Sequence, residues 1–244
     1  RELSDVGSLT GMVIDQDRNT LWISSGVFDP TPNAETAFRG LIGYNLTSKS
    51  IVHRLSAPQG ATLSDLHLSP SGDLFASDPI AGVIYRANRS DGQIGVVVPA
   101  GTFRSPQGLA VSAEDRLLYV SDYRYGIAIV DLTTGAVSRL GARSSMALDG
   151  IDGMWRVGNR LIGVQNGMKP MRIVAITLSD DGMSAERMDV LEQAHSGWTE
   201  PLGGTIHDGA LYYVATGQWD RFDANGSAGK CRLREKLTGF MMVF

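Results

Sequence analysis

The chain has 244 residues, 43% of them hydrophobic, and a formal net charge of −4 at pH 7. This length can bury a full core in one large domain or two small ones. The charges are mixed without a basic patch and no apolar run approaches the ~20 residues that span a bilayer, so neither nucleic acid nor a membrane span is expected. The single cysteine, Cys231, excludes an internal disulfide and a cysteine metal cluster.

Short apolar runs separated by glycine-rich turns follow one another along the chain and predict an all-β protein. Residues 10–26 predict a first pair of strands. Similar pairs return in residues 64–78, 107–122, 152–167 and 203–217. A helical alternative fails, because the apolar residues alternate or run together and show no 3.6-residue spacing.

A third strand is predicted after each of the first four pairs, in residues 40–46, 82–88, 126–132 and 172–178, and a fourth strand usually follows. Four short strands that recur about every 40 to 45 residues are typical of a propeller blade. We therefore expect an all-β propeller. Four blades are complete, near residues 11–57, 64–100, 107–142 and 152–193, and part of a fifth begins at Gly203.

This count leaves strand edges unpaired, and open edges invite self-association. The chain begins with Arg1 rather than Met, so an upstream blade is expected to be missing, and a signal peptide could be missing with it. The location is left open, with a periplasmic or secreted one preferred to the cytoplasm. Residues 1–229 are assigned to a single propeller domain. The tail, residues 230–244, matches no blade position; we favour an artefact over an anchor for a partner.

Two stretches are more specific than the repeat itself: "IDGMWRVGNRLIGVQNG" (residues 151–167) and "TEPLGGTIHDGALYYVATGQWDRFD" (residues 199–223). With the repeat, they resemble a bacterial branch of the regucalcin/gluconolactonase (senescence marker protein) family. The resemblance covers residues 10–226. It implies a six-bladed β-propeller, incomplete in this chain, with activity on lactones or esters. It also implies one divalent cation, often calcium, in the central channel.

The resemblance further implies which residues hold that cation. The family's ligands are a Glu of an early blade, an Asn at an N-G-L strand start and an Asp at a D-G-M strand start. Asp152 matches the last, Gln107 stands in the place of the Asn, and no early Glu can be assigned. The Gln carbonyl oxygen is displaced by one methylene, whereas a hard cation needs several oxygens at about 2.3–2.6 Å. The metal hypothesis, with Asp152 and Gln107 as ligands, is weakened accordingly.

The first residues of the predicted innermost strands should ring the mouth of the channel: Thr10, Ser64, Gln107, Asp152 and Gly203. Such polar residues can simply hydrate a water-filled channel. Asp149 lies just before Asp152, and two close carboxylates favour a cation or a raised pKa. Asp-Gly is also a common turn pair. We take Asp152 and Asp149 as candidate catalytic residues.

Asn166 is a candidate substrate-binding residue. Second strands end in Ser-Asp at Asp78 and Asp122, and this recurrence indicates structural carboxylates that accept backbone N–H groups. Asn166 breaks the Ser-Asp pattern within "QNGMKP" and is a better functional candidate.

Glu200 and Trp219 are the other candidates for binding a substrate. Glu200 follows His195 and Trp198 in a segment between blades. That segment could line a pocket, with Glu200 as base or ligand, or it could be a plain loop. Trp219 could stack on a ligand or cover the outer edge of the fifth blade.

Two functions from different classes remain open. In a lactonase-like hydrolase, a cation at Asp152 would polarise an ester carbonyl, and Asp152 or Asp149 would help to take the proton. The alternative is a non-catalytic propeller that binds a small ligand or a protein. The Gln107 replacement and the lack of a complete acid–base–nucleophile set favour this alternative. Fold alone does not decide between the two.

Overall fold

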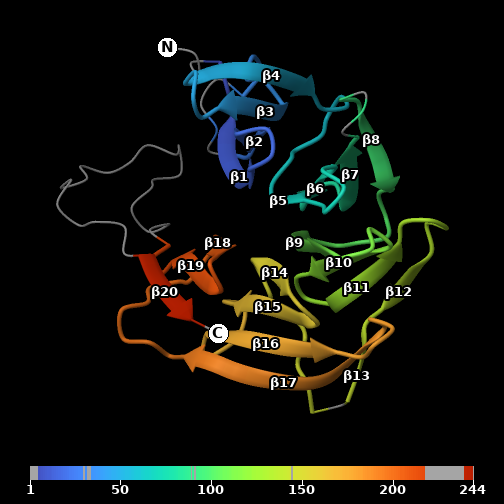
Figure 1. Cartoon of the computed structure of the whole chain (residues 1–244), viewed down its shortest axis with the longest axis vertical. Coiled ribbons are helices and arrows are strands. Elements are labelled where there is room, and N and C mark those ends of the chain that lie inside the picture. Colours follow the sequence, from blue (N-terminus) through green and yellow to red (C-terminus); the bar gives the residue numbers. More distant parts are fainter. Residues whose placement is uncertain are drawn as a thin grey trace.

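The computed structural model describes residues 5–29, 31, 34–88, 90, 92–143, 145–217 and 239–243. Throughout these residues the regular elements are β-strands, and none of the described residues forms a helix long and apolar enough to cross a membrane. The strands make five sheets arranged around a common centre (Figure 1). The chain is therefore an all-β propeller, as the repeat predicts.

Three sheets have four strands that follow one another in chain order. A fourth sheet has four such strands and one additional strand at its edge, and the fifth sheet has three strands. The first sheet contains β1 (Ser8–Asp15), β2 (Thr20–Gly26), β3 (Gly40–Asn45) and β4 (Ser50–Ser56). The second contains β5 (Leu66–Leu68), β6 (Leu74–Asp78), β7 (Val83–Ala87) and β8 (Ile94–Val98). The third contains β9 (Pro106–Val111), β10 (Leu117–Asp122), β11 (Gly126–Asp131) and β12 (Val137–Arg139).

The fourth sheet contains β14 (Met154–Val157), β15 (Arg160–Gln165), β16 (Arg172–Leu178) and β17 (Ser184–Gln193), with β13 (Gly141–Ala142) parallel to the start of β17. The fifth contains β18 (Gly204–His207), β19 (Ala210–Val214) and β20 (Gly239–Val243). These bounds confirm the four predicted complete blades and the predicted partial fifth.

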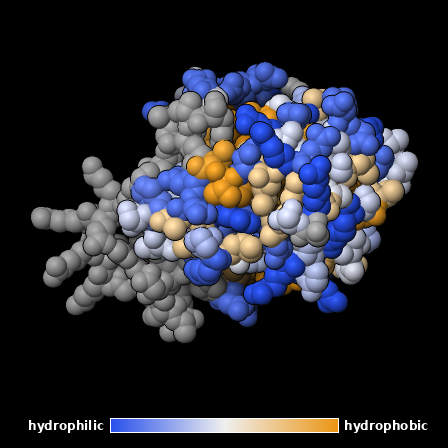
Figure 2. All heavy atoms as spheres, turned by 90° about the horizontal axis from the view of Figure 1, so that it is seen from below, coloured by the Kyte–Doolittle hydropathy of each residue, from blue (hydrophilic) through white to orange (hydrophobic). Residues whose placement is uncertain are grey.

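The strands β1, β5, β9, β14 and β18 lie nearest the centre, and in the fourth sheet β13 lies outermost, beyond β17 (Figure 1). The middle strands form the core: β10 is buried along its whole length, whereas β12 is exposed. Hydrophobic clusters fill the space between neighbouring sheets, as where Tyr119 of the third sheet packs with Ile176 of the fourth. The side of the molecule in Figure 2 is mostly hydrophilic, with a compact hydrophobic area.

The tail requires one correction. Residues Gly239–Val243 pair with β19 along its whole length, from Ala210↔Val243 to Val214↔Gly239. The expectation that the tail matches no blade position is therefore wrong for these residues, because they supply the third strand of the fifth sheet. The domain boundary at residue 229 and the artefact interpretation stay predictions.

Closure of the ring can be followed from the pairing of β1. Within the residues that the structure describes, β1 pairs with β2 alone, and no strand of the fifth sheet joins the first sheet. The five sheets are thus each built from their own stretch of chain. A missing upstream blade and self-association through open edges stay predictions.

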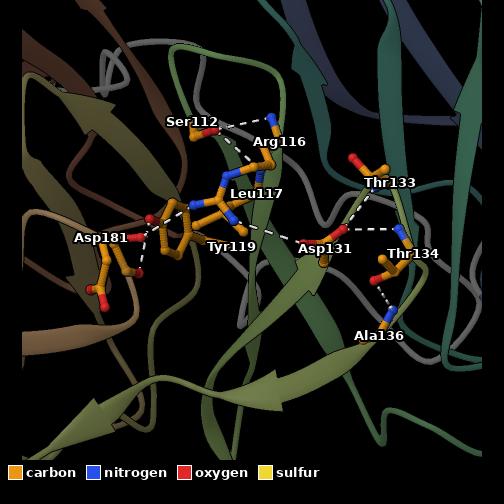
Figure 3. A network of polar contacts seen from close by, with 10 residues as sticks. Ser112, Arg116, Leu117, Tyr119, Asp131, Thr133, Thr134, Ala136 and Asp181 are labelled. Carbon is orange, nitrogen blue, oxygen red and sulfur yellow. Dashed lines mark hydrogen bonds and ion pairs between the residues drawn. The ribbon is translucent and has the colours of Figure 1, made fainter.

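Each sheet has two ends that differ in composition. We call the end where the innermost strands β9 and β14 begin, with Gln107 in the first and Asp152 just before the second, the mouth end. The opposite end is the turn end. Figure 3 shows the turn end between the third and fourth sheets. There Arg116 lies 3.7 Å from the Asp131 carboxylate and donates to the Asp181 carbonyl at 3.4 Å. The Tyr119 hydroxyl donates to the Gly182 carbonyl at 3.0 Å.

Candidate functional site

Polar residues of four innermost strands meet at the mouth end, as the sequence predicts. The Thr10 hydroxyl donates to the Ser64 carbonyl at 3.3 Å, which joins the first sheet to the second. The Gly108 N–H, next to Gln107, donates to the Asp152 carbonyl at 2.8 Å, which joins the third sheet to the fourth. Hydrogen bonds to the backbone of the neighbouring strand therefore fix the Cα positions of these polar residues.

In the fifth sheet the expected residue, Gly203, is one position off. The N–H of Asp152 donates to Val164, and in the same pattern the N–H of Leu202 donates to Val214. Leu202 thus takes the place of Asp152, and an apolar side chain replaces a polar one there. Gly203 was predicted in place of Leu202 because two consecutive glycines, Gly203 and Gly204, do not reveal at which residue the strand pairing begins.

Asp65 stands where the other four sheets carry glycine at the start of the innermost strand: Gly11, Gly108, Gly153 and Gly203. A side chain at Gly11 would bring its Cβ to 2.4 Å from the Ser64 carbonyl oxygen, and one at Gly108 to 2.5 Å from that of Asp152. Glycine is required at both positions because the next strand start packs directly against the backbone. Asp65 places a carboxylate in this inter-strand position instead, and sequence reasoning missed it.

The Asp65 carboxylate lies in a strongly perturbing environment. Its Oδ2 is buried and has no hydrogen-bond partner among the described residues. Burial raises the pKa of Asp65 to about 7, and the charge of Asp152 adds to the rise. A carboxylate without partners in a poorly solvated place favours its neutral form. Asp65 is therefore about half protonated near neutral pH.

Asp152 is held by Asn166. The Asn166 Nδ2 donates to Asp152 Oδ2 at 2.8 Å and to the Pro201 carbonyl at 3.1 Å. Burial raises the pKa of Asp152; the hydrogen bond from Asn166 opposes the rise and the charge of Glu200 adds to it. Asp152 and Asn166, both predicted, thus meet in one site, and the charge of Glu200 acts on it.

Tyr123 completes the hydrogen-bonded chain and was not predicted. Its hydroxyl donates to Asn166 Oδ1 at 2.7 Å, which fixes the amide so that its nitrogen faces Asp152. Burial raises the pKa of Tyr123, and the charges of Asp152 and Glu200 raise it further. Tyr123 follows Asp122 at the end of β10, just as Asn166 follows Gln165 at the end of β15.

This equivalence corrects the predicted break in the Ser-Asp pattern. Asp122 pairs with Gly126 at the end of β10, and Gln165 pairs with Arg172 at the end of β15. Gln165, not Asn166, therefore takes the place of the recurring aspartate. The structural interpretation of Asp122 holds, since its Oδ1 accepts the N–H groups of Arg104 and Ser105.

Asp78 has the same role in the second sheet. One of its carboxylate oxygens accepts the N–H of Thr62 at 2.7 Å, and the other accepts those of Ile80 and Ala81. The recurring aspartate therefore ties the incoming segment to the end of the second strand. Gln165 does so by donating to the Ala147 and Asp149 carbonyls.

The remaining predicted residues are spread more widely. Gln107 donates through Nε2 to Ser105 Oγ at 3.1 Å. The backbone of Glu200 forms a bridge to Thr216. Asp149 lines a separate hollow, and no hydrogen bond or ion pair joins it to Asp152 among the described residues. Trp219 lies outside the described residues.

His67 is a second residue whose environment the sequence did not reveal. Its Nε2 accepts the Val111 N–H at 3.2 Å, which links β5 to β9. Burial lowers the pKa of His67 to about 4, and the charge of Asp115 opposes this shift. His67 is therefore neutral at physiological pH and serves as a fixed acceptor between two blades.

The donors at the mouth end suit a hard cation in kind. Asp65, Asp152 and Glu200 repel one another, and the unpaired Asp65 Oδ2 offers an oxygen without a proton donor. In the described part of the chain, however, no three His, Cys, Asp or Glu residues lie close enough together to hold a metal ion. A cation there would take amide, carbonyl or water oxygens in addition.

No protein-family model matches the chain, and no curated protein matches it. Solved structures share its fold at low identity. A chain of the nidogen/laminin complex is 15% identical with a TM-score of 0.62, over 88% of this chain and 74% of its own length. Streptogramin B lyase is 16% identical with a TM-score of 0.63, over 88% and 64%.

A gluconolactonase of Xanthomonas campestris is 15% identical with a TM-score of 0.58, over 85% of this chain and 69% of its own length. The chain thus spans about two thirds of the lyase and of the gluconolactonase. Likeness at such identities shows the fold alone, a β-propeller that carries different functions in different proteins.

Proposed function

We propose that this propeller is a hydrolase that opens lactones or other esters at the mouth end of its channel, with Asp65 as the group that moves the proton. The observation that carries this proposal is the buried Asp65 carboxyl, whose pKa lies at about 7. A group with a pKa near the working pH can both accept and return a proton. The resemblance of residues 151–167 and 199–223, and the gluconolactonase of the same fold, support the substrate class.

The proposed reaction keeps its atoms balanced with a single carboxyl group. The oxygen of a water molecule bonds to the carbonyl carbon while one water proton passes to the Asp65 carboxylate. The tetrahedral species then breaks its bond to the ring or ester oxygen, and that oxygen takes the proton from Asp65. The product is a hydroxy acid from a lactone, or an acid and an alcohol from an ester.

The neighbouring residues prepare this proton transfer. Asn166 orients the Asp152 carboxylate, and Tyr123 fixes the Asn166 amide. The charge of Asp152 in turn raises the pKa of Asp65. Tyr123 and Asn166 are therefore positioning residues in this proposal, and Asp152 sets the protonation of Asp65.

A divalent cation, with calcium as the first candidate, belongs to the proposal. Asp152 and the carbonyl oxygen of Gln107 would hold it, with further oxygens from Asp65 or Glu200 and from water. When bound, such an ion polarises the carbonyl group of the substrate.

A non-catalytic role in binding a small ligand is the second candidate. Two observations favour it. The Asp152 Oδ2 already accepts a hydrogen bond from Asn166, and the Gln107 amide already donates to Ser105. A pre-formed set of polar groups of this kind could recognise a ligand without reacting with it.

The pH dependence of hydrolysis separates the two candidates. The wild-type protein would be assayed on a panel of lactones and carboxylic esters, without added cation and with calcium, magnesium, manganese or zinc. Without added cation, we expect kcat/KM to rise with pH up to about 7, as Asp65 loses its proton; a cation bound at Asp152 should shift this rise to lower pH. Asp65→Asn should abolish this rise of kcat/KM with pH and most of the hydrolysis rate. Asp131→Asn, a carboxylate of the turn end, is the matched control and should keep both. No hydrolysis by the wild-type protein, with ligand binding intact, would favour the non-catalytic role.

A further inference from the structure

A hollow of about 450 Å³ lies between the third and fourth sheets, outside the channel. Its lining comes from the turn between β10 and β11, from the end of β12, from β13 and from residues 146–149. Leu140 and Leu148 form a buried apolar part of this lining, and Met146 is partly buried beside them. Tyr125 is 55% exposed and offers an aromatic ring to a ligand. The hollow can therefore cover a short hydrocarbon body.

Three arginine residues line the same hollow: Arg124, Arg139 and Arg143. Arg139 donates to the buried carboxylate of Asp122 at 2.9 Å, which fixes its position. Arg124 and Arg143 have no ion-pair partner among the described residues. Asp149 is the one acidic residue of the lining. Counting Asp122 and Asp149 against the three arginines leaves one positive charge in excess.

We propose that this hollow binds the anionic group of an amphipathic organic anion, a carboxylate or a phosphate joined to a short hydrocarbon body. Arginine presents paired N–H donors that match the oxygens of either group. The apolar lining would cover the hydrocarbon part, as in most small-molecule sites.

The hollow adjoins the candidate site through the chain itself. Arg124 directly follows Tyr123, so their Cα atoms are about 3.8 Å apart. The charge of Arg124 also acts on the Tyr123 hydroxyl, where it opposes the larger effects that raise its pKa. A ligand held by Arg124 would therefore be bound by the residue next in the chain to Tyr123, which we assign to positioning in hydrolysis. This part of the inference rests on the proposed function. It narrows the proposed substrates of the hydrolase to esters that carry a negative charge away from the ester group.

Binding can be measured without any catalysis. Hexanoate, hexyl phosphate and the neutral hexanol would be titrated into the wild-type protein and followed by NMR chemical shifts and calorimetry. We expect both anions to bind at least tenfold more tightly than hexanol, and more weakly as salt is added. Whichever anion binds more tightly identifies the preferred headgroup. Equal affinity for hexanol and for both anions, or no binding of any probe at millimolar concentration, would overturn the proposal.

Variants place the anion in the hollow. Arg124→Gln and Arg143→Gln should each weaken anion binding about tenfold, since each removes a charge-assisted hydrogen bond, and leave hexanol unchanged. Arg18→Gln is the control, because this arginine pairs with Asp15 in the turn between β1 and β2 of the first sheet, away from the hollow. Anion affinity that survives both test substitutions, or that falls equally in the control, would contradict the assignment.

Kinetics then separate this inference from the proposed function. If esters are hydrolysed, Arg124→Gln should raise KM for an ester with a remote carboxylate and leave a neutral ester unaffected. If no ester is hydrolysed but the anions bind as described, the hollow stands and the hydrolase proposal fails.

Discussion

Two carboxylates at opposite ends of the sheets, Asp131 of the third sheet and Asp65 beside β5 of the second, have opposite surroundings. At the turn end, Asp131 Oδ1 accepts the N–H groups of Thr133 and Thr134 at 2.9 Å, and these bonds lower the pKa of Asp131. At the mouth end, Asp65 has a buried oxygen without a partner among the described residues, and its pKa is raised. Ordinary turn chemistry accounts for the first arrangement. The second costs stability, and such a cost is typical of functional sites.

The largest expected effect separates the two ends by activity. Asp65→Asn removes the carboxyl group that we assign to proton transfer, at the mouth end. We expect hydrolysis to fall by about 10²–10⁴-fold, the usual contribution of acid–base groups, while the protein stays folded. Asp131→Asn should change the rate less than twofold. Steady-state assays and circular dichroism check both, and equal rates for the two variants would break the comparison.

The second prediction concerns stability against pH. The folded-state pKa of Asp65 lies above its unfolded value, so its contribution is fully present below pH ~4 and is lost as the pH rises through about 7. Relative to wild type, Asp65→Asn should therefore gain stability as the pH rises over this window, by about 2–4 kcal/mol at pH 8. Urea unfolding at a series of pH values measures this difference. A constant difference from pH 4 to 8 would contradict the assigned shift.

His67 should show the opposite slope. Its folded-state pKa lies below its unfolded value, so its contribution is present above pH ~6.5 and is lost as the pH falls through about 4. His67→Gln keeps an acceptor for the Val111 N–H but has no proton to bind. Relative to wild type, it should lose stability as the pH rises from 4 to 6.5, by up to about 3 kcal/mol. If the stability of His67→Gln relative to wild type rose with pH in the same urea series, His67 would be charged in the folded protein.

A matched pair of tyrosines sharpens the comparison. Tyr123→Phe removes the hydroxyl that fixes Asn166, and Tyr119→Phe removes the one that bonds to Gly182. Each should cost about 1 kcal/mol of stability, the usual net value of a hydrogen bond. Only Tyr123→Phe should reduce kcat, by about tenfold, and shift the pH profile of kcat. If Tyr119→Phe moved the pH profile as well, the two ends would not be functionally distinct.

The smallest effect is expected from the turn-end acids. Hydrogen bonds from Ser179 and from the Met183 N–H lower the pKa of Asp181, which is exposed. Its contribution is present above the unfolded pKa of ~4 and is lost as the pH falls below it. Asp181→Asn should therefore lower the melting temperature slightly at pH 7 and not at pH 3. A larger effect at pH 3 than at pH 7 would reverse the assigned sign.

The sequence allowed much of the fold to be predicted and about half of the site. Short strands, turn glycines and the blade period identify the propeller because they are local features. Asp152 was found through the D-G-M strand start of the family resemblance, and Asn166 through a Ser-Asp alignment that was one position out of register. Asp65 was missed, since its burial depends on strand packing between sheets. Tyr123 was missed because its partner, Asn166, lies 43 residues away on another sheet.

Register explains the remaining errors. An extra residue at a strand end moves every assignment by one position, as at Gln165 and Leu202, and only the backbone pairing reveals it. The turn-end network, in contrast, uses contacts within a few residues, such as Asp131 with Thr133 and Thr134, that short motifs can predict.

The pKa of Asp65, measured directly, tests the central claim. Carbon-13 NMR of carboxyl-labelled protein would follow the aspartate side chains from pH 3 to 9, with the Asp65 signal identified by its loss in Asp65→Asn. We expect its midpoint near 7, and a lower midpoint in Asp152→Asn that stays above the ordinary value of about 4, because burial remains. A midpoint below 5 in the wild-type protein would contradict the proton-transfer role that we propose for the mouth end.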